Sequence, residues 1–140
     1  MVISNSKINN IIGNNTTVML PIRIFNPHKN RAYKTWGLID TGATGCAIPA
    51  DIAKMLGYKV TLGEQKKIST GNGNVVSYLH KMSIDFYHPD DPENKVIHTL
   101  DNVLIDCMPN LHMVLLGVEG FLSNFILNIN YPKGVFSLIR

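Results

Sequence analysis

The sequence predicts a single, mainly β domain. Apolar residues recur at strand period from residue 18 onward, and only one strong helical pattern occurs in the first hundred residues. The chain has 140 residues, of which 45% are hydrophobic and 16% charged, and this size and composition fit one domain with a substantial core. We therefore expect a flexible, polar N-terminal segment over residues 1–15 and one domain over residues 16–140.

The first half of the domain reads as a β-hairpin followed by a helix. A strand begins near Thr16, and the turn-forming residues 26–30 join it to a second strand over residues 32–39. Residues 49–57 predict a helix of about two turns, because a proline stands near its start, an acidic residue in its first turn and a glycine at its end.

A second hairpin is predicted further along, where strand-like residues 67–69 and 75–79 flank Gly and Asn residues that tolerate positive φ. One helical turn is expected within residues 119–124, and further strands over residues 96–100, 103–105, 125–129 and 135–139. The last of these is apolar for a chain end, so we expect its edge to be covered, and a dimer interface is one candidate. Tyr33 and Trp36 occupy strand positions and are expected in the core.

Charge and composition argue against several partners. The net charge of +3 comes from dispersed Lys and Arg residues, with no basic run and no nucleic-acid motif. No apolar stretch reaches the length of a membrane span, and the N-terminus lacks the apolar region of a secretory signal. Cys46, Cys107 and the five His residues are not spaced as metal ligands. We expect a cytoplasmic protein with no nucleic-acid partner, no membrane association, no metal and no cofactor.

One carboxylate stands out, because it lies where an apolar strand ends in a tight turn. Asp40 directly follows Leu38 and Ile39 and precedes Thr41 and Gly42. A charge at the end of a buried strand is costly unless it is paired or hydrogen-bonded. The sequence Asp40-Thr41-Gly42 could also be an ordinary turn in which the Asp side chain accepts a hydrogen bond from the turn backbone. A functional interpretation of Asp40 therefore depends on the rest of the sequence.

That context resembles the retropepsin-like aspartic proteases. Three features occur in the order of that family: Asp40-Thr41-Gly42-Ala43, the hairpin tip Thr70-Gly71-Asn72-Gly73-Asn74, and Leu115-Leu116-Gly117. The resemblance implies a closed β-barrel of the retropepsin type with one or two short helices.

The same resemblance implies a role for each feature. Asp40 would be the catalytic carboxylate, with Thr41, Gly42 and Ala43 supporting its loop. The tip residues Thr70, Gly71, Asn72, Gly73 and Asn74 would form a flap that closes over an extended polypeptide substrate. Leu115, Leu116 and Gly117 would pass behind the loop, where a side chain at position 117 would collide with neighbouring backbone.

Aspartic proteases work with two carboxylates that share a proton, yet this chain has one Asp-Thr-Gly sequence. The chain is too short for two such lobes, so the chemistry implies a homodimer with its two-fold axis between two copies of Asp40. We assign no catalytic part to Asp85, Asp101 or Asp106, which we expect to face solvent.

Two other interpretations remain open from the sequence. The chain could be a noncatalytic retropepsin-like module that binds peptides or dimerises without hydrolysis. It could also be a monomeric hydrolase that uses Asp40 with another acidic residue of the same chain.

Overall fold

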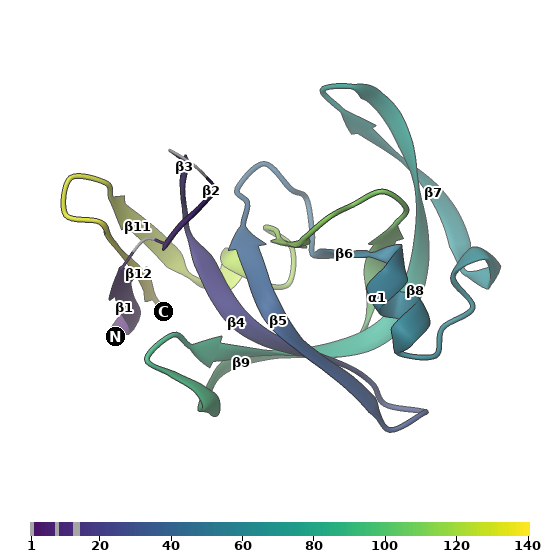
Figure 1. The fold of residues 1–140 in the computed structure, drawn as a ribbon, viewed down its shortest axis with the longest axis horizontal. Helices are drawn as coiled ribbons and strands as arrows, with labels where there is room; N and C mark the ends of the chain where they lie inside the picture. Colours follow the sequence, from purple (N-terminus) through teal and green to yellow (C-terminus); the bar gives the residue numbers. More distant parts are fainter. Residues whose placement is uncertain (1, 8, 13–14) are drawn as a thin grey trace.

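The computed structural model describes residues 2–7, 9–12 and 15–140, with side chains from residue 17 onward. Its main feature is a barrel closed by neighbouring strands in the order β4-β5-β10-β6-β9-β8, with a further β4–β8 pairing that completes the ring of six (Figure 1). These strands are β4 (Met19–Asn26), β5 (Arg31–Ile39), β6 (Ala47–Pro49), β8 (Gly73–His88), β9 (Asp91–Met108) and β10 (Val114–Leu116).

The barrel is mixed, since β10 runs parallel to β5 and β6 parallel to β9 while its other pairings are antiparallel. A seventh strand, β7 (Glu64–Thr70), adds to β8 outside the ring. Helical structure in the described chain is short: α1 (Ala50–Met55) and 3-10 turns at Val60–Leu62 and Leu122–Asn124. The prediction of a closed β-barrel with few short helices is confirmed.

The β4–β5 hairpin shows how the sequence pattern produces the barrel wall. Leu20, Ile22 and Ile24 on β4 are at most 1% exposed because alternate residues of a strand face the same side. On β5, Gly37 faces inward so tightly that an added Cβ would lie 2.8 Å from Cγ of Leu116. Its neighbour Trp36 must therefore face outward and is 41% exposed, so the prediction of a core Trp36 is wrong, whereas Tyr33 does pack on the core.

The two ends of the chain meet in a separate three-stranded sheet. Its order is β1-β12-β11, formed by β1 (Val2–Lys7), β12 (Val135–Ile139) and β11 (Ile126–Asn130). Figure 1 shows both termini at this sheet. β12 is paired on both sides within its own chain, so its edges are covered, as expected for an apolar chain end, by β1 and β11.

The segment predicted as flexible, residues 1–15, contains strands in its described part. Besides β1, β2 (Asn9–Ile12) pairs with β3 (Asn15–Thr17). Backbone N–H and C=O groups can form these ladders whatever the polarity of the side chains, which is why an Asn-rich composition did not reveal them. Residues 1, 8, 13 and 14 lie outside the described part.

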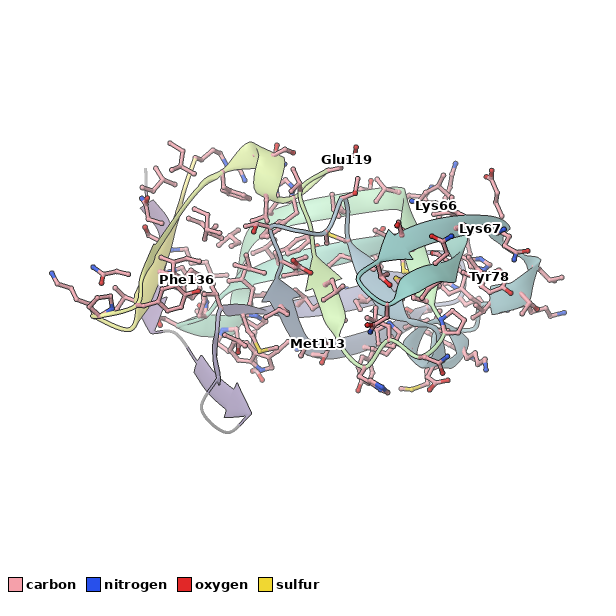
Figure 2. The ribbon with its side chains drawn as sticks, turned by 90° about the horizontal axis from the view of Figure 1, so that it is seen from above. Lys66, Lys67, Tyr78, Met113, Glu119 and Phe136 are labelled. Carbon is pink, nitrogen blue, oxygen red and sulfur yellow. The ribbon has the colours of Figure 1, made fainter. Side chains whose placement is uncertain are left out.

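Aromatic packing joins the terminal sheet region to the barrel. Phe86 and Phe121 stack with ring centroids 4.2 Å apart, and the Arg140 guanidinium lies 4.8 Å from the Phe125 ring centroid. Figure 2 shows Phe136 of the terminal sheet at one end of the molecule and Lys66, Lys67 and Tyr78 of the β7–β8 hairpin at the other. Among the described residues, no helix has the length and apolar character that a membrane span requires.

Candidate active site

Asp40 begins the loop that follows β5, and backbone hydrogen bonds define its position. Its N–H donates to the carbonyl oxygen of Leu116 at 3.1 Å, and the Ala43 N–H donates back to the Asp40 carbonyl at 3.2 Å. The Gly42 N–H donates to Oδ1 of the Asp40 carboxylate at 2.9 Å. The side chain thus caps its own turn through one oxygen, while no described residue donates to Oδ2.

The segment Leu115, Leu116 and Gly117 holds this loop from behind. β10 pairs with β5, and beyond it the N–H groups of Val118 and Glu119 donate to the carbonyls of Ala43 and Thr44 at 3.0 and 2.7 Å. A Cβ at Gly117 would lie 2.7 Å from the Ala43 carbonyl oxygen and would collide with the Gly45 carbonyl group. The close approach expected at Gly117 is therefore present.

The Asp40 carboxylate lines a cavity of about 530 Å³ between its loop and β7. Residues of the Asp40 loop, of β7 and of β10 line this cavity, among them Asp40, Gly42, Ala43, Ile68, Thr70 and Leu115. Thr41 is exposed beside it, and its hydroxyl has no partner among the described residues. The space is large enough for side chains of an extended peptide.

The predicted hairpin tip lies at the end of β7 and β8. Thr70 Oγ1 donates to the Gly73 carbonyl oxygen at 2.7 Å and accepts from the Asn72 N–H at 3.3 Å. Gly73 has φ of +103°, a conformation that other residues rarely adopt. Thr70 lines the cavity of Asp40, whereas Gly71, Asn72, Gly73 and Asn74 are exposed and do not. Thr70 and Asn72 also line a separate cavity of about 500 Å³ against the loop at residues 108–111.

Asp106 is the residue that sequence reasoning missed. It lines the same cavity as Asp40, and its side chain is only 13% exposed. Ser77 Oγ donates to its Oδ1 at 2.8 Å, and Lys66 Nζ lies 3.3 Å from both of its oxygens. The expectation that Asp106 faces solvent is therefore wrong. A charge between Ile105 and Cys107 in an apolar strand was the available signal, and the same logic singles out Asp40.

The other two carboxylates play structural parts. Asp85 is 19% exposed at its side chain, accepts from Thr99 Oγ1 at 2.9 Å and lies 3.8 Å from Arg23, so it is not simply solvent-facing. Asp101 is exposed and accepts a hydrogen bond from Ser83. Neither residue lines the cavity of Asp40.

Both cysteines are buried and held in the neutral form. Burial raises the pKa of the Cys46 thiol to about 11, opposed in part by a hydrogen bond with the Gly117 backbone. Burial and then the nearby charge of Asp106 raise the pKa of Cys107 to about 12. Within the described ranges, no group of three or more His, Cys, Asp or Glu side chains could hold a metal ion. Neither cysteine lines the cavity of Asp40.

Comparison with known proteins agrees with this geometry. Residues 28–119 match the family model described as aspartyl protease. Eight chains of solved structures match the fold. Among them is a retropepsin-like aspartic protease from Rickettsia conorii, with 19% sequence identity and a TM-score of 0.56 over 96% of this chain and 89% of that chain. No curated protein sequence matches significantly.

Proposed function

This chain belongs to the retropepsin-like aspartyl proteases, and from that premise we propose that it is an aspartic endopeptidase, active as a homodimer with Asp40 of each subunit in one dyad. The observation that carries the proposal is the position of Asp40. Its loop is hydrogen-bonded to Leu116 from behind, one carboxylate oxygen accepts from Gly42, and the side chain lines a cavity. Such preorganisation suits a group that must act on a bound substrate.

The dyad requires a second carboxylate, and the same chain offers a poor one. Asp106 shares the cavity, but both of its oxygens already contact Lys66, and the buried Ser77 donates a hydrogen bond to Oδ1. Because these contacts occupy its oxygens, Asp106 is poorly placed to form a dyad with Asp40. This favours a symmetry-related Asp40 over the monomeric alternative. The Thr41 hydroxyl is exposed and has no partner among the described residues, so it would hydrogen-bond across the two-fold axis.

In the proposed reaction, one Asp40 is ionised and its mate is protonated. The ionised carboxylate takes a proton from water as the water oxygen bonds to the peptide carbonyl carbon, and the protonated carboxyl gives its proton to the carbonyl oxygen. The carboxyl that accepted the water proton then gives it to the amide nitrogen, while the other carboxylate takes a proton from one hydroxyl of the diol. The C–N bond breaks to leave an amine and a carboxylic acid, and the dyad returns to its starting state. The β7–β8 hairpin would act as the flap, with Thr70 against the substrate and the tip beyond it.

The test is cleavage of a peptide mixture by the wild-type protein and by Asp40→Asn. The substitution keeps the shape of the side chain and removes the shared-proton chemistry, so we expect proteolysis to fall by about 10²–10⁴-fold. Asp51→Asn is the matched control, because Asp51 is an exposed residue of α1. Equal proteolysis by wild type and Asp40→Asn would rule out the assignment. Peptide binding without turnover by the wild type would support the noncatalytic alternative.

A further inference from the structure

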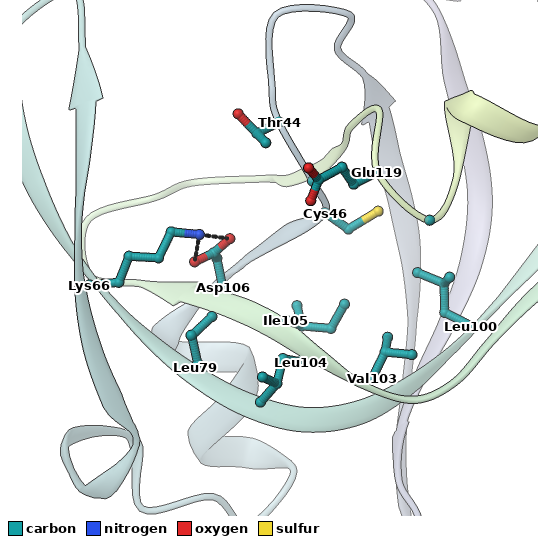
Figure 3. A pocket seen from close by; sticks show the side chains of 12 residues that line it. Thr44, Cys46, Lys66, Leu79, Leu100, Val103, Leu104, Ile105, Asp106 and Glu119 are labelled. Atoms are coloured by element: carbon teal, nitrogen blue, oxygen red, sulfur yellow. Dashed lines mark hydrogen bonds and ion pairs between the residues drawn. The ribbon is translucent and has the colours of Figure 1, made fainter.

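A second cavity, of about 350 Å³, adjoins the one that Asp40 lines (Figure 3). The two share four residues: Thr44, Gly45, Lys66 and Asp106. A peptide that lies extended in the first cavity would therefore run past the opening of the second. The second cavity is placed to receive a side chain that flanks the scissile bond.

The floor of the second cavity is apolar. Leu79 of β8 and Leu100, Val103 and Ile105 of β9 line it, and Figure 3 shows these side chains below the polar groups. A long side chain would bury its methylene groups here, and each buried methylene is favourable by about 0.8 kcal/mol. The floor thus favours an extended aliphatic stem.

The polar groups of the cavity leave one negative charge unbalanced. Lys66 is already paired with Asp106, so these two charges offset one another. Glu119, an exposed residue, also lines the cavity and lies above the apolar side chains in Figure 3. Its backbone N–H is fixed to Thr44, but its carboxylate has no hydrogen-bond or ion-pair partner in the described part of the chain. The cavity therefore combines an apolar floor with an unpaired carboxylate.

We propose that this cavity binds a Lys or Arg side chain of the polypeptide substrate, with the stem on the apolar floor and the cationic group at Glu119. Glu119 is then a specificity-determining residue. A purely apolar side chain would cover the carboxylate without pairing it, which is unfavourable, and an acidic one would meet like charge. The inference rests on the proposed protease function for its substrate, and it goes further by naming the side chain that is selected.

The proposed two-fold symmetry sharpens this expectation. Two copies of the cavity would lie at equal distances on either side of the dyad, because a two-fold axis relates them. A single extended peptide would meet both. We therefore expect Lys and Arg enrichment at two substrate positions that are equally distant from the cleaved bond.

The experiment profiles cleavage sites in a peptide mixture and then measures kcat/KM for a matched pair of peptides with Lys or Met at the enriched position. We expect Glu119→Gln to lower the Lys/Met ratio by about fivefold, as for a partly solvated ion pair, and Glu119→Lys to favour Glu instead. Glu93→Gln is the control, because Glu93 is exposed and lines none of the three cavities described above. No basic preference, or a ratio unchanged in Glu119→Gln, overturns the inference while leaving proteolysis intact.

A failure of the proposed function gives a different result. If the wild-type protein cleaves no peptide, binding of fluorescently labelled peptides that differ only by Lys or Met at one position is measured with the wild type and with both Glu119 variants. Preferential binding of Lys peptides that Glu119→Gln weakens supports the inference without hydrolysis. Absence of binding, or equal binding of Lys and Met peptides, overturns it.

Discussion

Gly117 packs its Cα against the backbone of Gly45 so closely that a Cβ at position 117 would overlap the Gly45 carbonyl group. This contact joins the segment after β10 to the loop of Asp40. Because backbone atoms stand on both sides, neither can move aside as a flexible side chain could. The position of the proposed catalytic carboxylate thus depends on a residue without a side chain.

We expect Gly117→Ala to lower the free energy of unfolding by about 1–3 kcal/mol, the usual cost of overpacking, and to reduce peptide cleavage. Urea unfolding checks the first effect and kcat/KM the second. Gly71→Ala is the control for stability, since a Cβ at Gly71 meets no atom within 4 Å. Equal stability of both variants would show that the loop adapts.

Mixing subunits tests the dimer directly. When wild type and Asp40→Asn are unfolded together in equal amounts and refolded, random pairing leaves about a quarter of the dimers with two intact carboxylates. Activity per total protein should then fall to about a quarter of the wild-type value. A monomeric enzyme would retain half, so this measurement separates the two mechanisms.

Thr41 provides a test of the proposed two-fold contact. Its hydroxyl is exposed and has no partner among the described residues, so Thr41→Val should leave the monomer stable. We expect the variant to dimerise more weakly, with activity that is lost on dilution and restored at high concentration. Thr41→Ser, which keeps the hydroxyl, should behave as wild type in sedimentation and in cleavage. Dimerisation of Thr41→Val at wild-type strength would contradict this role.

The Asp106 network should stabilise the base of the hairpin. Asp106→Ala leaves the fully buried hydroxyl of Ser77 without its acceptor, which costs about 1–3 kcal/mol. We expect reduced stability and faster hydrogen exchange along β7, where Lys66 loses its partner. Asp51→Ala, which removes an exposed carboxylate 4.0 Å from Lys54, should change little. Exchange along β7 that matches wild type would contradict the prediction.

The buried thiols predict a loss of stability at alkaline pH. The ordinary thiol pKa is 9.0, but the folded chain keeps Cys46 protonated up to a pKa of about 11 and Cys107 up to about 12. The unfolded chain therefore releases these protons at a lower pH than the folded chain does. The contribution of the two buried thiols to the free energy of unfolding is thus complete below pH 9 and is lost as the pH rises toward 12. Burial also raises the pKa of Tyr58 from 10.0 to about 12, which adds to the effect.

The measurement compares urea unfolding near pH 8 and near pH 10.5, on either side of the ordinary thiol pKa. Replacing both cysteines by Ala should lower the free energy of unfolding at both pH values, because the thiols are buried. The decrease in the free energy of unfolding from about pH 8 to about pH 10.5 should, however, be smaller in the double variant than in the wild type. An equal fall in the wild type and the double variant would contradict the prediction.

The tight packing at Gly117 against Gly45 followed from the family resemblance, whereas local pattern was sufficient for the strand before Asp40, the helix after it and the Gly-rich hairpin. Each of these rests on neighbours within a few residues, such as the Gly at position 73 whose φ of +103° the tip requires. The sequence by itself determined these elements and the family resemblance they carry.

Strand pairing determined the features that the sequence alone did not predict. Asp106 faces the cavity because β9 lies between β8 and β6 in one particular register, and Trp36 faces solvent because Gly37 must fit against Leu116. β12 is paired on both sides because the two chain ends meet. A shift of one residue reverses every side chain of a strand, and register depends on partners far away in sequence. Only the tertiary structure could therefore show what surrounds Asp40.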